Sequence, residues 1–406
     1  MTLKTSPISS NPHLSADFGI MIDLSSYPDG VFDPMQMSDQ SFAELEKLLY
    51  THSLVLWRGV KLTPAQQLRL TKLFDQASNS YGHGTETSGL QSKSILHPDL
   101  KTLPEHPQVQ LIGNGQVTDE AVAPGLKPLP VLKHPHHKTF HKSVISDEDE
   151  EKGYTRFYRW HIDAALYGLN PPKVTTLQAL RVPAGPPQIC RYDDGTGDEL
   201  TVPLGTTAFV SGQKMFEILP PELKSLAVRT KVQYSPHPYV WMSEAKAKPN
   251  GLGIECEGKE LPRDKLPPYE ESKIKTFPVL WKNPVTGLLH LEVHPCGAEK
   301  LIIEPIPHHT KASRNPQALY PDGATVSDLE VVREILYKLQ RPGISPAYVY
   351  AHDWKENDLC LFHNHGVLHS VVGAFKPDQH RAFWQCNIAA SDEPVGPDSA
   401  DVKRYS

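Results

Sequence analysis

The stretch Arg159-Trp160-His161-Ile162-Asp163 is the part of the sequence on which the prediction of fold and function depends. Side chains of an extended segment alternate between two faces, so His161 and Asp163 point the same way while Ile162 points into packing. An imidazole beside a carboxylate supplies two ligands of a 2-His-1-carboxylate site, which leaves one face of an Fe(II) ion open for oxygen chemistry. A lone His-x-Asp is common, so this prediction requires a second histidine elsewhere.

The second histidine is expected on a late strand. Three candidates lie in the segment His363-Asn364-His365-Gly366-Val367-Leu368-His369, and Arg381 follows with aromatic neighbours. A buried guanidinium binds both oxygens of a carboxylate through its planar fork. A dicarboxylate co-substrate that chelates iron at one end needs such a group at the other. We therefore favour His369, together with Arg381, over His363 and His365.

Composition excludes several classes of protein. The 406 residues include 38 prolines and 26 glycines, which favours many loops and bounded strands over a long helical bundle. The net charge of −6 gives no general attraction to nucleic acid or to an anionic membrane, and no apolar run approaches membrane-spanning length. Five scattered cysteines and an N-terminus without an apolar signal core predict a cytoplasmic protein, either monomer or homo-oligomer.

Strand-like segments lie on both sides of the His-x-Asp, and helical spacing is confined to early and late parts of the chain. Strands are expected at 19–24, 53–60, 108–113, 173–180, 206–210, 277–281, 289–293, 359–362 and 382–388. Helices are expected at 41–50, from 64 onward, at 220–226 and at 327–340, with Thr63 and Ser327 as N-caps. This order predicts a mainly β fold with helical cover, an antiparallel barrel or jelly roll in one domain spanning 1–406.

Several segments are expected to lie outside the core. They are a loose N-terminal arm at 1–15, a lid-like loop at 115–155, and insertions at 240–275 and 305–325. The loop contains four histidines among prolines and lysines (His134, His136, His137 and His141), which favours a mobile solvated segment over a metal site. The acidic run from Asp147 to Glu151 is expected to be solvated surface.

With these motifs together, the chain resembles the taurine/2,4-dichlorophenoxyacetate dioxygenase family. The resemblance extends from Leu54-Val55-Leu56-Trp57-Arg58-Gly59 to the last strand. It implies a double-stranded β-helix (jelly roll) core and an oxidoreductase that uses Fe(II), 2-oxoglutarate and O2. The family's metal triad falls on His161, Asp163 and His369. Its 2-oxoglutarate residues fall on Arg381 and on Thr207, which begins Thr207-Ala208-Phe209.

A closer resemblance concerns the segments Trp160 to Tyr167 and Arg191 to Leu200, which are similar to the fungal xanthine dioxygenases. Those enzymes hydroxylate xanthine at C8 to uric acid, with succinate and carbon dioxide as co-products. The resemblance implies a set of purine-binding residues: Gln110, Lys133, Asp149, Glu150, Gln385 and Asn387. Many family members carry a second arginine where this chain has Gln385. Amides suit a purine edge better than an anionic substrate, because they both donate and accept.

Other interpretations of these residues remain. His161 and Asp163 could be a hydrogen-bonded strand pair, Arg381 could pair with a structural carboxylate, and Lys133 could be an ordinary surface lysine. At the level of function, the alternatives are a family member acting on another purine or a sulfonate, a catalytically silent jelly-roll binding protein, and a zinc-dependent hydrolase.

Overall fold

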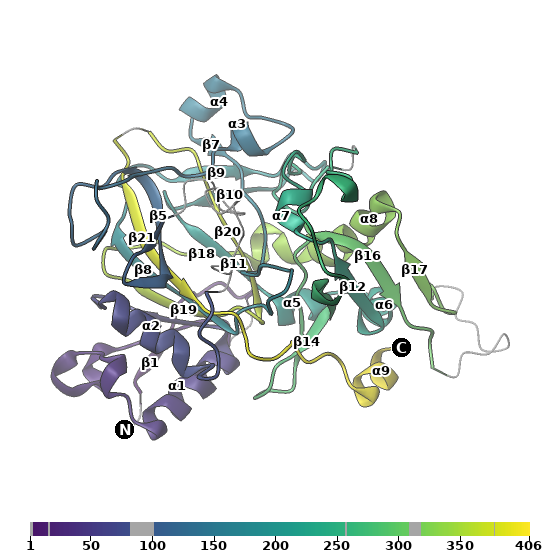
Figure 1. Ribbon diagram of the computed structural model, residues 1–406, viewed down its shortest axis with the longest axis horizontal. Helices are drawn as coiled ribbons and strands as arrows, with labels where there is room; N and C mark the ends of the chain where they lie inside the picture. Colours follow the sequence, from purple (N-terminus) through teal and green to yellow (C-terminus); the bar gives the residue numbers. More distant parts are fainter. Residues whose placement is uncertain (1–2, 15–16, 82–100, 256–257, 308–317, 377) are drawn as a thin grey trace.

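The computed structural model describes residues 3–14, 17–81, 101–255, 258–307, 318–376 and 378–406. A large sheet flanked by the N-terminal helices occupies one side of the molecule, and a smaller sheet covered by late helices occupies the other (Figure 1). The fold is thus a mixture of sheets and helices. Within the described ranges, no helix combines the length and the apolar character that crossing a membrane requires.

The large sheet places late strands between early ones. Its order is β1-β2-β3-β19-β8-β21-β5-β4, with β6 pairing with β5 at the side. The bounds are β1 Thr5–Pro7, β2 Ile20–Ile22, β3 Leu54–Trp57, β19 Leu359–His363, β8 Val174–Arg181, β21 Arg381–Asn387, β5 His106–Gln116, β4 Lys101–Leu103 and β6 Val131–Leu132. Apart from the parallel pair β2 and β3, the pairs in this sheet are antiparallel, as predicted.

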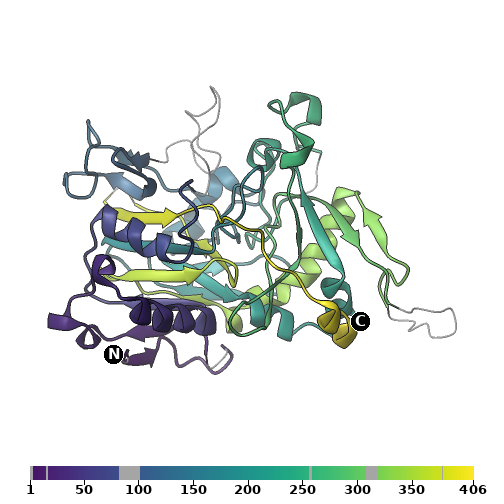
Figure 2. The same cartoon turned by 60° about the horizontal axis from the view of Figure 1, so that its bottom comes forward.

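Two early helices cover this sheet. Helix α1 (Asp39–His52) begins after the N-cap Ser38 and contacts β3 and β19, and α2 (Pro64–Leu73) contacts β5, β8 and β21. Thr63 is the N-cap of α2 and Pro64 is its first residue, as predicted, and Thr63 and Gln66 also form a reciprocal capping box. Figure 2 shows both helices, in purple, against the strands.

A short sheet faces the large one and carries part of the predicted site. Strand β11 (Thr207–Ser211) lies between β18 (Tyr350–Ala351) and β20 (Val367–Val371). In the β11–β20 pair, Phe209 is opposite His369. A further sheet contains β10 (Glu199–Val202), β9 (Gln188–Arg191) and β7 (Tyr154–Thr155).

The smaller side of the molecule is built around the order β13-β12-β16-β17. The bounds are β13 Thr276–Pro278, β12 Thr230–Tyr234, β16 Ala298–Ile303 and β17 Ala324–Val326. The antiparallel strands β14 (Leu280–Lys282) and β15 (Leu289–Leu291) form a hairpin beside them. Helices α5 (Gly212–Glu217), α6 (Pro221–Val228), α7 (Pro238–Trp241), α8 (Leu329–Gln340) and α9 (Ser399–Tyr405) surround it. The N-cap of α8 is Asp328 and not Ser327, because the Asp328 carboxylate accepts from two helix N–H groups.

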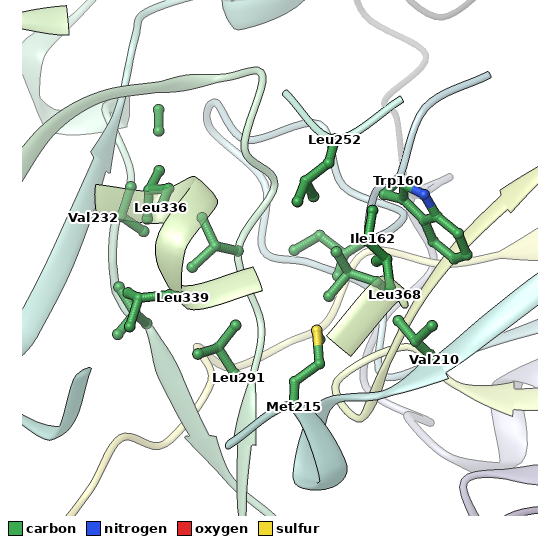
Figure 3. Close-up of a cluster of buried hydrophobic side chains, with 14 of the residues drawn as sticks. Trp160, Ile162, Val210, Met215, Val232, Leu252, Leu291, Leu336, Leu339 and Leu368 are labelled. Atoms are coloured by element: carbon green, nitrogen blue, oxygen red, sulfur yellow. The ribbon is translucent and has the colours of Figure 1, made fainter. Parts of the chain in front are cut away.

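One apolar core joins the two sides. Figure 3 shows Trp160, Ile162 and Leu368 at one side of a buried cluster that continues to residues of α8 and β12 at its other side. Trp160 and Ile162 alternate with His161, and Leu368 precedes His369. The packing of these neighbours directs the two histidines to the opposite face, as the alternation predicted.

Several segments expected outside the core are better ordered than predicted. Residues 5–7 of the expected loose arm pair with β2. The 115–155 segment contains β6, β7, α3 (His137–Phe140) and α4 (Asp147–Glu151). The 240–275 segment contributes to a small core with Trp241, Ile254 and Leu266. Residues 308–317 of the other insertion lie outside the described residues.

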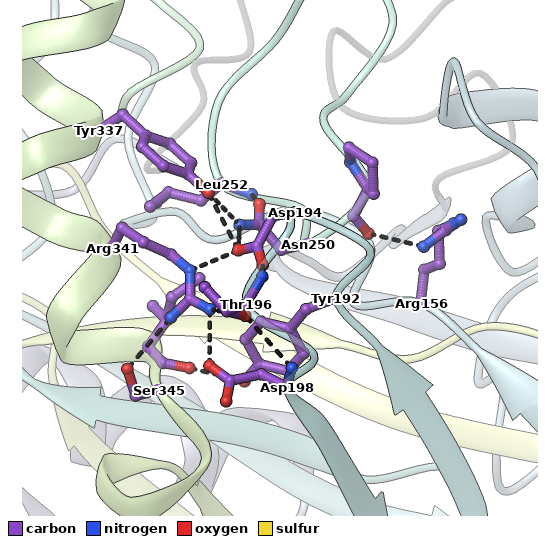
Figure 4. Close-up of polar contacts among 12 residues, drawn as sticks. Arg156, Tyr192, Asp194, Thr196, Asp198, Asn250, Leu252, Tyr337, Arg341 and Ser345 are labelled. Atoms are coloured by element: carbon purple, nitrogen blue, oxygen red, sulfur yellow. Dashed lines mark hydrogen bonds and ion pairs between the residues drawn. The ribbon is translucent and has the colours of Figure 1, made fainter.

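Hydrogen bonds and ion pairs tie the turn at residues 193–197, between β9 and β10, to the end of α8. Arg341 pairs with Asp198 at 2.6 Å and also with Asp194, while Asn250 donates to Asp194 at 2.9 Å (Figure 4). These contacts hold the turn against the end of α8 and the segment that contains Asn250.

Candidate metal centre and substrate cavity

The structure brings His161, Asp163 and His369 together. Their ligand atoms all lie within 4.8 Å of one another. Oδ1 of Asp163 lies 3.9 Å from Nε2 of His161 and 3.7 Å from Nε2 of His369. A reciprocal backbone pair, with N–H···O distances of 3.0 Å in both directions, holds His161 beside His369 although they are far apart in sequence.

The other two histidines near His369 do not join this cluster. The ring of His363 lies 4.7 Å from that of Tyr50, and Nε2 of His365 donates to the Pro171 carbonyl at 2.9 Å. Both rings contact other residues and neither belongs to the group formed by His161, Asp163 and His369, which agrees with the preference for His369.

Contacts around the cluster orient its ligand atoms. Nδ1 of His161 donates to the Arg159 carbonyl at 2.9 Å, which leaves Nε2 as the lone-pair nitrogen. Oδ2 of Asp163 accepts from the Thr175 hydroxyl at 2.7 Å and from Nε2 of Gln385 at 3.0 Å. Oδ1 of Asp163 is therefore the oxygen that faces both imidazoles.

Asn364 holds the backbone of Asp163. Its Oδ1 accepts from the Asp163 N–H at 2.8 Å, and its Nδ2 donates to the carbonyls of Asp163 and Pro172, both at 2.8 Å. The side chain is fully buried. Satisfied buried polar groups of this kind fix a local conformation.

The cluster fits a divalent metal. Burial lowers the pKa of His369 to about 3, and burial and the neighbouring His369 lower the pKa of His161 to about 3, so both imidazoles are neutral near pH 7. Two neutral nitrogens and a carboxylate oxygen converge without a hydrogen-bond donor from the described residues between them. Convergent acceptors of this type call for a cation, and this set is the one that non-haem Fe(II) prefers.

A cavity of about 130 Å³ opens beside the cluster. Its polar lining includes several of the predicted residues: Gln110, Lys133, His161, Asp163, Thr207, His369, Arg381 and Gln385. One water needs only about 10–15 Å³ on this measure, so the cavity has room for a small organic molecule.

Arg381 reaches this cavity as a buried cation. Its side chain is 2% exposed, its Nε donates to the Gly205 carbonyl at 3.3 Å, and its guanidinium carbon lies 3.9 Å from the Phe383 ring centroid. Burial lowers its pKa to about 9, so it remains charged near pH 7. No carboxylate of the described residues forms an ion pair with it. The guanidinium thus has a carboxylate-binding face to offer a ligand.

Of the remaining predicted residues, Thr207, Gln110 and Gln385 line the cavity, whereas Asn387, Asp149 and Glu150 do not. Thr207, whose Oγ1 accepts from Nε1 of Trp354 at 3.2 Å, still has a hydroxyl proton to donate. Gln110 and Gln385 are opposite each other in the β5–β21 pair. Asn387 is buried but is not among the residues that line the cavity, and neither polar atom of its side chain has a partner among the described residues.

Asp149 and Glu150 are not brought to the cavity. Both lie in α4, where Asp149 pairs with Arg191 at 3.0 Å and Glu150 pairs with His137 and Lys138, each at 2.9 Å. None of the residues of α4 is buried, which agrees with the predicted solvated surface. The geometry gives these two carboxylates a role in ion pairs and none at the cavity.

The prediction of a mobile solvated histidine loop is wrong for two of its members. His137 and His141 are buried, and Nε2 of His141 donates to the Phe157 carbonyl at 2.9 Å. His136, His137 and Glu150 also bring ligand-type atoms within 4.8 Å. However, the Lys138 ammonium already neutralises Glu150, so this second group lacks the free carboxylate of the first.

The sequence analysis assigned no role to Asn364, Thr175 or Arg159. Arg159 lines the cavity and precedes His161 by two positions, so strand alternation alone would have placed it on the ligand face. Thr175 and Asn364 act across sequence distances of 12 and 201 residues from Asp163, respectively, and no local pattern announces such contacts.

The fold and the site define a class of protein with known members. Residues 28–387 match the family described as taurine catabolism dioxygenase TauD, TfdA family, and the chain belongs to this family. A xanthine dioxygenase dependent on alpha-ketoglutarate from Schizosaccharomyces pombe is 50% identical over 405 residues, covering 98% of this chain and 91% of the relative. One from Neurospora crassa is 51% identical over 389 residues, covering 94% and 87%.

Solved structures show the same fold at low sequence identity. A putative alpha-ketoglutarate-dependent taurine dioxygenase from Burkholderia xenovorans superposes with a TM-score of 0.51 at 15% identity, covering 98% of this chain and 96% of that one. AAD-2 in complex with Mn(II) and N-oxalylglycine superposes with a TM-score of 0.52 at 13% identity, covering 97% and 100%.

Proposed function

We propose that this protein is an Fe(II)- and 2-oxoglutarate-dependent dioxygenase that hydroxylates xanthine at C8 to uric acid, with release of succinate and CO2. The observation that carries the proposal is the sharing of one cavity by the His161–Asp163–His369 cluster and the buried Arg381 guanidinium. The identity of about 50% with two xanthine dioxygenases over most of both chains supports the choice of substrate.

In the proposed mechanism, the fold contributes a two-layered scaffold. The large sheet and the β18-β11-β20 sheet would form the double-stranded β-helix, with the cavity between them. His161, Asp163 and His369 would hold Fe(II), while Arg381 and the Thr207 hydroxyl would bind the far carboxylate of 2-oxoglutarate. Iron with 2-oxoglutarate and O2 supplies the oxidation when bound.

The other cavity residues would orient the purine. Gln110 and Lys133 line the cavity from the β5 side, and their amide and ammonium groups can donate to purine oxygens or nitrogens. Asn387 lies on β21 with Gln385 but does not line the cavity, so its proposed role in purine binding rests on the family resemblance and on two buried amide atoms that have no partner among the described residues. Gln385 donates one amide N–H to Asp163 and would offer its other N–H and its carbonyl oxygen to the purine, because it also lines the cavity.

The proposed partner is a small molecule in the cytoplasm. The four cysteines in the described part of the chain are free, as expected in a reducing compartment.

A direct test is xanthine-dependent turnover of 2-oxoglutarate by the protein loaded with Fe(II). We expect urate and succinate in equal amounts with xanthine, and no urate after chelation of the metal or with Asp163→Ala. Succinate formation with another purine or a sulfonate but not with xanthine would refute the substrate. Turnover with Zn(II) in the absence of 2-oxoglutarate would refute the class.

A further inference from the structure

Arg159 is a second buried arginine at the cavity, and the proposed mechanism does not use it. It is 8% exposed and lines the cavity with His161 and Asp163. Its guanidinium carbon lies 4.8 Å from the Phe140 ring centroid, 5.3 Å from that of Tyr158 and 5.8 Å from that of Tyr239. Three aromatic rings thus surround the cation.

The hydrogen-bond capacity of this guanidinium is largely unused within the described residues. Nη2 donates to the Tyr158 hydroxyl at 3.2 Å, whereas Nε and Nη1 are buried and have no partner among these residues. No carboxylate of the described ranges forms an ion pair with Arg159. Aromatic faces compensate part of a buried positive charge, but they do not replace an anion or a carbonyl acceptor.

The neighbouring Arg156 shows what a structural arginine looks like in the same segment. It is 1% exposed, its Nη2 pairs with Asp193 at 2.7 Å, and its Nε donates to the Ser143 carbonyl at 2.8 Å. Arg156 does not line the cavity. Both side chains are buried, and of the two only Arg159, at the cavity, lacks a carboxylate partner among the described residues.

We propose that Arg159 recognises the substrate itself, by supplying charge and N–H donors to a planar oxo-heterocycle that binds as an anion. A purine dione fits this description, because its carbonyl oxygens accept hydrogen bonds and its ring N–H groups are acidic. This inference rests on the proposed function and extends it: Arg381 serves the co-substrate, and Arg159 selects the ionised form of the substrate. The aromatic rings hold the guanidinium in place and keep water from it.

The test compares steady-state kinetics of Arg159→Gln and Arg159→Lys with wild type, varying xanthine and 2-oxoglutarate separately. We expect Arg159→Gln to raise KM for xanthine about 10- to 100-fold, the range for one hydrogen bond to a charged group, with little change in kcat or in KM for 2-oxoglutarate. Arg159→Lys keeps the charge and should recover part of the loss.

A pH profile separates recognition from a structural role. In wild type, KM for xanthine should fall as pH rises through the first ionisation of xanthine, and this dependence should flatten in Arg159→Gln. The wild-type profile alone tests the proposal if that variant does not fold. Arg156→Lys is the matched control, and it should lower the thermal midpoint without moving KM for xanthine.

Three results would overturn the inference. One is an unchanged KM for xanthine in an Arg159→Gln protein of lowered stability, which would make the aromatic cage structural. Another is a rise in KM for 2-oxoglutarate in place of xanthine. The third is a wild-type KM that rises with pH through the ionisation of xanthine. The three results above require a wild-type protein that forms urate, so they refute the role of Arg159 and leave the proposed function standing. A wild-type protein that forms no urate refutes the proposed function, and this inference with it.

Discussion

Replacing Asn364 by alanine removes the three hydrogen bonds that hold the Asp163 and Pro172 backbone, each 2.8 Å long. A typical intramolecular hydrogen bond contributes about 1 kcal/mol net, so we expect the free energy of unfolding to fall by about 3 kcal/mol. Urea unfolding followed by tryptophan fluorescence measures this loss.

The same replacement should weaken the metal centre. Asp163 would lose the contact that fixes its backbone, and residues that orient metal ligands typically contribute about 10- to 100-fold in metal affinity. An anaerobic titration with Fe(II) in the presence of 2-oxoglutarate, followed by the visible absorption of the complex, gives the affinity.

Asn250 offers a matched control. It is also buried and makes three hydrogen bonds, donating to Asp194 at 2.9 Å and to Tyr337 at 2.8 Å and accepting from the Leu252 N–H at 2.9 Å (Figure 4). It does not line the cavity. Asn250→Ala should therefore lose similar stability and keep its Fe(II) affinity. Equal Fe(II) affinities in wild type and Asn364→Ala would refute the reasoning, as would an equal loss in both variants.

Three further predictions concern buried charge. Arg381→Met should raise KM for 2-oxoglutarate at least about 30-fold, since truncating one side of a buried charge pair typically costs 2 kcal/mol or more, and an unaltered KM would contradict this role. Five buried histidines among the described residues have a pKa lowered to about 3 or 4: His141, His161, His290, His365 and His369. As pH falls, the unfolded chain binds protons at these histidines at a higher pH than the folded protein does, so the stability of the metal-free protein should fall below about pH 6.5. A urea midpoint that stays constant from about pH 7.5 to 5.5 would count against this. Burial raises the pKa of Glu292 well above 4.5, so the folded state keeps a proton that the unfolded state releases and stability is lost as pH rises through this range. Glu292→Gln should remove that loss, and its urea midpoint relative to wild type should increase between about pH 5 and pH 8; a constant difference would show that the carboxyl is not buried in its neutral form.

The sequence contained enough to predict that His161, Asp163 and His369 come together. The alternation of His161 and Asp163 is a local property of an extended segment, and Trp160 and Ile162 pack into the core as that alternation requires. The choice of His369 required the spacing to Arg381 and a resemblance to a family. Backbone pairing between His161 and His369 joins segments far apart in sequence, and a single sequence carries no direct signal for such pairing.

The supporting contacts were less accessible. Gln385 was predicted to bind substrate, and it lines the cavity; its additional hydrogen bond to Asp163 was not predicted, because β21 and the segment that carries Asp163 converge only in three dimensions. His137 and His141 stand among prolines and lysines, a composition typical of exposed loops, yet both side chains are buried. Composition describes the average of a segment, whereas burial is decided side chain by side chain.

The order of strands in the large sheet has a consequence for synthesis on the ribosome. Strand β19 lies between β3 and β8, and β21 lies between β8 and β5. These two interior strands are the last of the sheet in the sequence, so the ribosome makes them after all the others. Until residue 387 has emerged, the earlier strands have open edges that invite pairing with other chains. We therefore expect the nascent polypeptide to be prone to aggregation until β21 has been made. A premature stop before β21 should yield an aggregating fragment and no partly active enzyme.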